Sequence, residues 1–490
     1  MCGVVGIIGT RDAAREAFLG LTTLQHRGQD AAGILTHDEE GFHRVKNIGL
    51  VDSVFTRENV ETLTGSIALG HARYATIGKG DLSDVQPFLL SYPFGIGMVH
   101  NGNIVNVEEL AADLKDRLRR NLLTKSDTEI VLNIFAEGLQ STPAGQMSSK
   151  EMFEHICTAV RGIYDRVVGS YSIVAMIAGY GLVAFRDPNG IRPLVWGKRQ
   201  NGAGDGHIFA SESVSLSFLG YELERDLLAG EVVFIDESGQ AFTKVLMARE
   251  ERHCMFEWVY FASPESVIDD VPVYGARINL GKNLASLVKA QIASGKIAPD
   301  IVVPVPETSR IAAIALSEEL GIPYREVLIK NRYIKRTFIL DSQEKRQRAV
   351  NLKLSPVQSE IVGKKVLLID DSIVRGTTSK KIIELVRQAG AKEVYFVSTC
   401  PPIQHPCYYG IDFPVESELI AAKRALPEIE KALGADAVIY QDFAGLKNSV
   451  SPSGSTPCMA CVDGKYPTDT KAMKKFAENR SHDRVKETGK

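Results

Sequence analysis

The chain begins with Met-Cys-Gly-Val-Val-Gly-Ile-Ile-Gly over residues 1–9, where a cysteine precedes a short apolar run that predicts a β-strand. Start methionines are usually removed before a residue as small as cysteine, and Cys2 would then carry a thiol and a free α-amine. An α-amine has an ordinary pKa of about 7.7–8.0, so part of it is unprotonated at neutral pH and can take the thiol proton. A cysteine at this position is more often an ordinary residue of a frayed terminus. The strand behind it favours the other interpretation, a nucleophile that supplies its own base.

The composition is that of a globular protein with more than one domain. The 490 residues are 44 % hydrophobic and 24 % charged, with a net charge of −3. A chain of this length predicts about two to four domains. The charge gives no sign of a nucleic-acid or membrane partner, and no apolar run approaches the length of about 18 residues that a span needs, so we expect a cytoplasmic protein. Seven cysteines favour metal-binding or catalytic roles over a disulfide framework.

The chain divides into two halves with different patterns. Up to about residue 245, short apolar or alternating segments predict an antiparallel sheet with helices packed on it. The strands are expected at 66–70, 96–100, 170–177, 182–186, 207–210 and 231–235, the helices at 12–25, 126–137 and 151–160, and a surface loop at 201–206. From about residue 255, strands alternate with helices, which predicts a parallel sheet with crossover helices. Here strands are expected at 300–306, 324–329, 365–370 and 392–399, and helices at 308–320 and 378–388. The charged tail at 471–490 is expected to be solvated.

Four short motifs follow Cys2 in the first half. They are Leu-Gln-His-Arg-Gly-Gln-Asp-Ala-Ala-Gly at 24–33, Gly-His-Ala-Arg-Tyr-Ala-Thr at 70–76, His-Asn-Gly-Asn at 100–103 and Ser-Asp-Thr-Glu at 126–129. Taken singly they indicate solvated charges, a hairpin turn or a helix cap. Together and in this order they resemble the N-terminal-nucleophile glutamine amidotransferases, a family whose fold is an αββα sandwich, which we expect over residues 2–245.

That resemblance implies a role for five residues. Cys2 attacks the side-chain amide of glutamine, while Asn101 and the backbone N–H of Gly102 form the oxyanion hole. Arg73 holds the α-carboxylate through two parallel hydrogen bonds, a geometry that its planar guanidinium permits. Asp127 receives the α-ammonium. The stretch 73–84, interrupted by glycines, is expected to close over bound glutamine.

A second signature lies at 366–378, where an apolar strand ends in two acids and a Gly/Ser/Thr loop that leads into a helix. Backbone N–H groups at a helix N-terminus bind anions, and paired acids suit sugar hydroxyls or hydrated Mg²⁺. The acids could instead simply cap the helix. The string resembles the phosphoribosyl pyrophosphate signature of type I phosphoribosyltransferases, which implies a parallel α/β domain at 255–470. The binding residues implied are Asp370, Asp371, Ser372, Arg375, Gly376, Thr377, Thr378 and Lys330, with Thr308, Asp370 and Asp371 at the Mg²⁺.

The segment from Lys330 to about residue 348 is strongly basic and has no helical or strand period. A charge run of this kind is most often a solvated face. Beside a pyrophosphate site it is better interpreted as a lid that excludes water from the reacting ribose.

Across nearly its whole length the chain resembles the glutamine phosphoribosylpyrophosphate amidotransferases. The resemblance implies formation of 5-phosphoribosylamine, glutamate and pyrophosphate from glutamine, phosphoribosyl pyrophosphate and water, the first step of de novo purine synthesis. It also implies an ammonia passage between two sites, inhibition by purine nucleotides and a homo-oligomer, commonly a tetramer. Two alternatives are a regulatory protein that only senses phosphoribosyl pyrophosphate and another N-terminal-nucleophile amidotransferase with a different acceptor.

Four cysteines predict a metal site. Cys458 and Cys461 have metal-ligand spacing, and Cys254 and Cys407 lie in segments that resemble the iron–sulfur branch of the family. Four thiolates fit a [4Fe–4S] cluster or, as the alternative, Zn²⁺, and the resemblance alone favours iron. Cys157 and Cys400 are interpreted as packing residues. Only Met1 precedes Cys2, so we expect removal of that one residue to expose the nucleophile.

Overall fold

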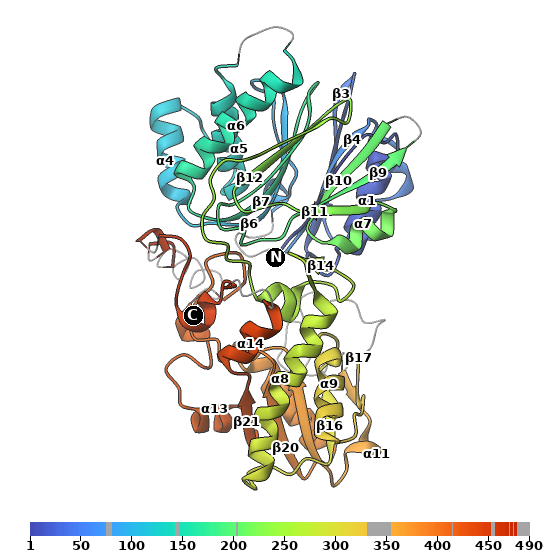
Figure 1. Ribbon diagram of the computed structural model, residues 1–490, viewed down its shortest axis with the longest axis vertical. Coiled ribbons are helices and arrows are strands. Elements are labelled where there is room, and N and C mark those ends of the chain that lie inside the picture. Colours follow the sequence, from blue (N-terminus) through green and yellow to red (C-terminus); the bar gives the residue numbers. More distant parts are fainter. Residues whose placement is uncertain are drawn as a thin grey trace.

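The computed structural model describes residues 1–74, 81–142, 147–201, 204–330, 354–413, 415–451, 456–469, 471–473 and 475–477. The first half forms two antiparallel sheets that face each other (Figure 1). Within the described residues, the first sheet has the order β11 (Glu222–Asp226), β9 (Val195–Asn201), β10 (Gly204–Ala210), β1 (Gly3–Ile8), β4 (Ile67–Arg73), β2 (Ala31–Asp38) and β3 (Gly41–Ile48). The second has the order β13 (Ala241–Val245), β12 (Glu231–Asp236), β8 (Gly181–Arg186), β7 (Gly169–Ile177), β6 (Ile96–Ile104) and β5 (Phe88–Leu90).

Helices cover the outer face of each sheet and make the arrangement an αββα sandwich. Helices α1 (Ala13–Thr23) and α7 (Ser213–Leu219) lie on the first sheet, and α5 (Asp127–Leu139) and α6 (Ser149–Arg166) on the second, beside α4 (Val107–Leu118). The position of strand β1 explains why its sequence is continuously apolar. Val5 and Ile7 pack against the helices, while Val4 and Ile8 pack between the sheets. Both faces are buried, so no polar alternation is needed.

The second half contains a parallel sheet of β16 (Ile301–Pro304), β19 (Lys365–Asp370), β20 (Glu393–Ser398) and β21 (Ala437–Tyr440), in that order. Val366 and Leu368 of β19 pack on the side of α12 (Thr377–Gln388) and α13 (Leu426–Leu433). Leu367 and Ile369 pack on the side of α8 (Val273–Ala293) and α9 (Arg310–Leu320). The two acids after β19 therefore lie at the carboxyl edge of a sheet that is covered on both faces, where α/β folds bind ligands.

The remaining described elements are short. They are α2 (Val51–Val54), α3 (Arg57–Glu61), η1 (Leu82–Asp84), η2 (Glu257–Phe261), β14 (Val267–Ile268), β15 (Val271–Pro272), β17 (Leu328–Lys330), β18 (Leu354–Pro356), α11 (Gln358–Ile361), η3 (Glu416–Glu418), α14 (Phe443–Val450) and α15 (Ala460–Asp463). Among the helices of the described ranges, none has the length and apolar character to cross a membrane.

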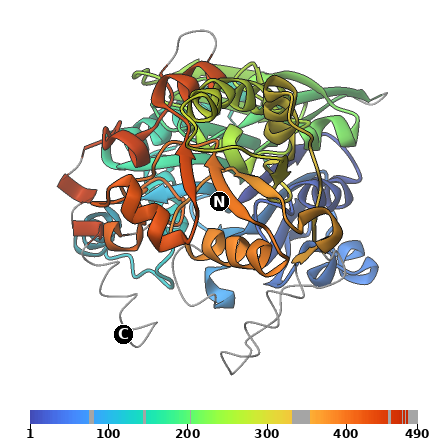
Figure 2. The ribbon, with the colours of Figure 1, turned by 90° about the horizontal axis from the view of Figure 1, so that it is seen from below.

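The two halves meet around the N-terminus, which lies between them in Figure 1 and near the middle of the outline in Figure 2. Met1 and Ile191 of the first half share one apolar cluster with Phe256, Cys400 and Leu446 of the second. The nucleophile candidate therefore stands at the interface between the domains.

Three local expectations differ from the structure. A loop was expected at 201–206, but β9 and β10 pair as far as Asn201 and Gly204. The expectation is therefore wrong for the described part of this range; residues 202–203 lie outside the described residues. The strand expected at 324–329 is wrong in extent. Tyr324 makes only a bridge to Val302, and β17 pairs with β18 in a separate sheet. The tail is not wholly solvated, because Met473 is buried and Lys475 pairs with Glu108. The basic segment beyond Lys330 lies outside the described residues up to 353, as do residues 75–80 of the expected glutamine loop.

Candidate active sites

Cys2 lines a cavity of about 730 Å³ that is formed mainly by the sandwich domain and is also lined by Ala472, Lys475 and Phe476 of the C-terminal segment. The cavity is also lined by Arg73, Gly102 and Asp127. Strand β4, which carries Arg73 at its end, pairs directly with β1. Strand β6 carries Gly102, and α5 begins at Asp127. The structure thus brings together residues that are 125 positions apart and that the sequence assigned to one glutamine site.

Asn101 is oriented by the backbone of the cysteine. The N–H of Cys2 donates to Asn101 Oδ1 at 3.1 Å. The other end of the carboxamide, Asn101 Nδ2, is buried and has no hydrogen-bond partner among the described residues. A buried donor without a partner is costly, and its position beside a nucleophile suits the stabilisation of a developing negative charge.

Gly102 cannot be replaced by a larger residue in this backbone. Its φ is 155°, and an added Cβ would lie 2.0 Å from the carbonyl oxygen of Ser170 and 2.8 Å from His100 Nε2. The glycine therefore allows β6 to run close to β7 beneath the cavity.

The two charges expected to hold glutamine have contacts of their own. Arg73 Nη2 lies 3.8 Å from Asp84 Oδ2. Asp127 Oδ1 lies 3.6 Å from His100 Nδ1, and its Oδ2 accepts from the N–H of Ile104 at 3.2 Å. Burial would raise the pKa of Asp127, but His100 lowers it below the ordinary value. A negative carboxylate is therefore held at the cavity wall, as recognition of an ammonium group requires.

The cavity is also lined by residues that were not assigned from the sequence, among them His100, Gln86 and Asp84. His100 immediately precedes Asn101 and was quoted only as part of a motif. Gln86 fixes its backbone, since Gln86 Oε1 accepts from the N–H of His100 at 2.7 Å. Asp84 ends the expected glutamine loop and reaches Arg73. Only the adjacency of His100 to Asn101 could have indicated a role.

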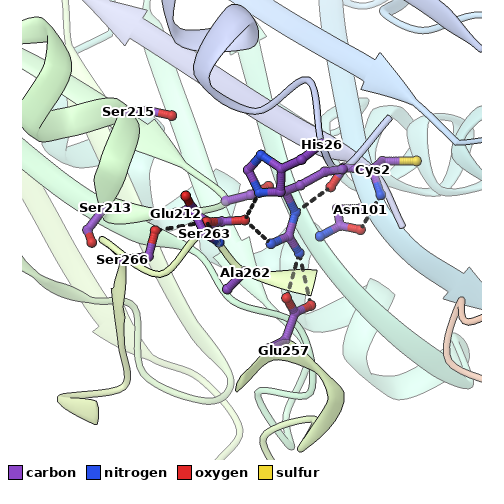
Figure 3. A network of polar contacts seen from close by, with 12 residues as sticks. Cys2, His26, Asn101, Glu212, Ser213, Ser215, Glu257, Ala262, Ser263 and Ser266 are labelled. Atoms are coloured by element: carbon purple, nitrogen blue, oxygen red, sulfur yellow. Dashed lines mark hydrogen bonds and ion pairs between the residues drawn. The ribbon is translucent and has the colours of Figure 1, made fainter. Parts of the chain in front are cut away.

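With Met1 in place, the nitrogen of Cys2 is a peptide amide. The α-amino group of Met1 is buried, and burial lowers its pKa to about 6. The thiol points away from the neighbouring buried ionic contacts (Figure 3). A base at Cys2 itself therefore requires removal of Met1.

The second site lies at the carboxyl end of β19. Asp370 and Asp371 are buried, and Asp371 accepts from Thr308 Oγ1 at 2.5 Å and from Ser372 Oγ at 2.7 Å. Burial and the charge of Asp371 raise the pKa of Asp370 well above its ordinary value, and burial also raises the pKa of Asp371. Two buried carboxylates with a hydroxyl beside them fit a hard divalent cation, which would offset their repulsion.

The loop after these acids forms the start of α12. Gly376 has a φ of 73°, and an added Cβ would lie 2.4 Å from Ile420, so this turn requires glycine. Thr377 and Thr378 are the first two residues of the helix, where free N–H groups and hydroxyls are available to an anion. Arg375 is instead engaged by acids, since its Nε donates to Glu418 at 2.7 Å. Lys330 is exposed at the end of β17.

The four metal-ligand candidates lie in one buried region of the second half. Cys254 and Cys458 form a parallel bridge, in which the N–H of Cys458 donates to His253 O at 2.7 Å. Cys254, Cys407, Cys458, Cys461 and also Cys400 belong to the same apolar cluster. Burial raises the pKa of Cys254 to about 11 and that of Cys461 well above its ordinary value. Within the described ranges, no three His, Cys, Asp or Glu side chains form a set that could hold a single metal ion.

The fold and the two sites define a glutamine amidotransferase joined to a phosphoribosyltransferase. The model of the glutamine amidotransferase domain matches residues 71–217, and that of the phosphoribosyl transferase domain matches residues 276–410. Amidophosphoribosyltransferase of Pseudomonas aeruginosa is 45 % identical, over 96 % of this chain and 93 % of the relative, and that of Escherichia coli is 45 % identical over 92 % and 88 %. The structure of glutamine phosphoribosylpyrophosphate amidotransferase from B. subtilis, complexed with ADP and GMP, matches with a TM-score of 0.83 and 36 % identity, over 96 % of this chain and 98 % of that one.

The chain belongs to the amidophosphoribosyltransferase family. It is an enzyme of the first step of purine biosynthesis, as the sequence predicted. The two alternatives, a regulatory protein that only senses phosphoribosyl pyrophosphate and an amidotransferase with a different acceptor, are set aside. The chain contains both domains and is similar over nearly its full length to amidophosphoribosyltransferases.

Proposed function

We propose that Cys2 hydrolyses glutamine in the cavity of the sandwich domain. After Met1 is removed, the α-amine takes the thiol proton and the sulfur attacks the side-chain amide carbon. Asn101 Nδ2 and the N–H of Gly102 donate to the oxygen that becomes negative. Ammonia leaves, and water then hydrolyses the glutamyl thioester. The observation that carries the proposal is the contact between the Cys2 nitrogen and Asn101, which leaves a buried amide donor beside the nucleophile.

We propose that the ammonia is used at the carboxyl edge of the parallel sheet. The start of α12, with Thr377 and Thr378, would hold the ribose phosphate, and the acids the ribose hydroxyls. Asp370, Asp371 and Thr308 would hold Mg²⁺, which when bound supplies positive charge against the pyrophosphate leaving group. Lys330, exposed at the end of β17, would contact the phosphoribosyl pyrophosphate while ammonia displaces pyrophosphate at the ribose C1.

The complete reaction has a direct test. Purified enzyme given glutamine, phosphoribosyl pyrophosphate and Mg²⁺ is expected to release pyrophosphate and glutamate in equal amounts. Glutamate without pyrophosphate would contradict the proposed coupling of the two sites.

Arg73→Lys is expected to raise the KM for glutamine and to leave kcat nearly unchanged. Lysine keeps the charge but loses the paired geometry at the α-carboxylate. Loss of one charge-assisted hydrogen bond costs about 1.5–3 kcal/mol, which corresponds to roughly a 10- to 100-fold higher KM. Steady-state kinetics with varied glutamine measures this. Arg57→Lys, at an exposed pair with Glu61, is the control, and an unchanged KM in Arg73→Lys would remove Arg73 from the glutamine site.

We propose that Cys254, Cys407, Cys458 and Cys461 bind a [4Fe–4S] cluster. The support is the burial of four thiols in one apolar region and the backbone pairing of Cys254 with Cys458. A thiolate ligand set of this kind, when it holds the cluster, cross-links distant segments of the second half.

Enzyme purified without oxygen is expected to be brown and to contain iron and sulfide. Cys458→Ser should lose the iron, because one of the four thiolates is removed. Iron analysis and visible absorption measure both, with Cys157→Ser on α6 as the control because Cys157 is buried in another cluster. Colourless enzyme with stoichiometric zinc would support the alternative metal.

We also propose a cytoplasmic homotetramer that purine nucleotides inhibit. The B. subtilis structure with ADP and GMP supports nucleotide binding. Sedimentation of the purified protein tests the oligomeric state, and the rate of pyrophosphate release with and without these nucleotides tests the inhibition.

A further inference from the structure

Four buried charges meet where the two domains join. Arg27, Arg192, Glu212 and Glu257 are each at most 1 % exposed. They sum to zero charge, which allows burial without an uncompensated ion. Figure 3 shows Glu212 and Glu257 in this network, with Cys2 beside it.

Arg27 uses its whole guanidinium group in this network. Its Nε donates to the backbone carbonyl of Cys2 at 3.1 Å, and its Nη1 to Glu212 Oε1 at 2.5 Å. Its Nη2 lies 2.9 and 2.8 Å from the two carboxylate oxygens of Glu257. Because the guanidinium is planar, the two carboxylates fix the direction of Nε. The position of the Cys2 carbonyl is therefore coupled to both acids.

Glu257 reaches this network from the other domain. It is the first residue of η2 in the second half, 230 positions after Arg27. Arg277 of α8 holds the turn, since it donates to Trp258 O at 2.9 Å and to Ala262 O at 2.7 Å. Arg192 Nη1 lies 3.3 Å from Glu257 Oε1. The turn that carries Glu257 is thus held by the phosphoribosyltransferase domain, while the carboxylate contacts Arg27 and Arg192 of the sandwich domain.

Glu212 makes the converse contact, from the first domain to residues of the second. It belongs to the first half, and its Oε2 accepts from the N–H of Ser263 and from Ser266 Oγ, both at 2.8 Å. Each domain therefore contributes one buried carboxylate that is bound by residues of the other domain. Arg27 stands at its centre and makes the contact to the nucleophilic residue.

We propose that Glu257 is a positioning residue for glutamine hydrolysis, which acts through Arg27 to fix the backbone of Cys2 and the direction of its thiol. The second domain then supplies part of the geometry of the first domain's site. The inference goes beyond the proposed function but requires Cys2 as nucleophile. A displacement of about 1 Å at a reacting group lowers a rate by about a hundredfold, so loss of this support affects turnover more than glutamine binding.

Glu257→Gln keeps the shape and removes the charge that orients Arg27. We expect kcat with glutamine to fall by about 10- to 100-fold, while KM for glutamine and the rate with added ammonia change by less than about threefold. An unchanged kcat would overturn the proposal. An equal fall in the glutamine and ammonia rates would also overturn it, because that is the result of a merely structural role.

A double-variant cycle separates positioning from independent stabilisation. If Glu257 acts through Arg27, the variant with both Arg27→Lys and Glu257→Gln should have a kcat within about threefold of that of Arg27→Lys alone. Multiplied losses would overturn the proposal. If Glu257→Gln does not fold, Glu257→Asp withdraws the carboxylate by one methylene group and should lower kcat in the same direction; a wild-type kcat there overturns the proposal equally.

Asp269→Asn is the matched control. Asp269 Oδ1 is 2.8 Å from buried Arg186 Nη1 across the same boundary, but within the described residues no hydrogen bond or ion pair joins these two side chains to Cys2. The Asp269→Asn variant should keep the glutamine-dependent rate within about threefold of wild type, even if its melting temperature is lower. If Cys2→Ala retained glutamine-dependent activity, the nucleophile assignment would fail separately, whatever Glu257→Gln did.

Discussion

Cys2→Ala is expected to abolish synthesis of phosphoribosylamine from glutamine while synthesis from added ammonia continues. Alanine retains the α-amine and the small side chain but has no sulfur to form the thioester. Loss of an essential nucleophile lowers kcat by about four to six orders of magnitude. The acids at 370–371 and the start of α12 lie at and beyond the end of β19 in the parallel sheet of the second half, whereas Cys2 precedes β1 of the sandwich. The reaction with free ammonia should therefore keep at least half of its rate.

Pyrophosphate release, measured with glutamine and with ammonium chloride in parallel, distinguishes the two activities. Cys157→Ala serves as the control, since Cys157 is buried on α6 outside both sites. Loss of both activities in a folded Cys2→Ala variant would contradict separable sites. Retention of the glutamine rate would remove Cys2 from the mechanism.

The parts of the proposed glutamine site could be picked out in the sequence because its residues lie in short, distinctive strings. Cys2 opens a strand with a continuous apolar run, and Asn101 and Gly102 follow a second such run. The acids at the end of β19 were equally visible, since a buried parallel strand that ends in charge is uncommon. The order of these strings along the chain was sufficient to indicate both domains and the reaction.

The contacts between the domains could not be predicted in the same way. Arg27 and Glu257 are 230 residues apart. Arg27 lies within the motif at 24–33, but in sequence neither its charge nor that of Glu257 differs from a solvated charge. Their burial depends on how the two domains dock, which no local pattern encodes. Strand β17 was misjudged for a related reason, because the segment 324–329, whose second half is apolar, suits either a central strand or the short ribbon that forms with β18.

Asp371→Asn is expected to lose both the glutamine-dependent and the ammonia-dependent synthesis, in contrast to Cys2→Ala. Asp371 accepts hydrogen bonds from Thr308 and Ser372 and lies beside Asp370. Asparagine keeps the size but removes one negative charge from the proposed Mg²⁺ site. Loss of a preorganised charged group lowers kcat by about two to three orders of magnitude, and the Mg²⁺ concentration needed for half the maximal rate should rise.

The control for this variant lies at the other edge of the same sheet. Asp300 precedes β16 and accepts from the N–H of Lys365, where β19 begins. Asp300→Asn removes the same charge from the same sheet at its amino edge, so both synthesis rates should stay within about twofold of wild type. Comparison of Asp371→Asn and Asp300→Asn with Cys2→Ala locates each half-reaction. A loss confined to the glutamine-dependent rate indicates a defect in the sandwich domain. A loss of both rates indicates a defect at the carboxyl edge of the parallel sheet, where ammonia from either source must react. Normal ammonia-dependent synthesis in Asp371→Asn would place the acceptor site elsewhere in the chain.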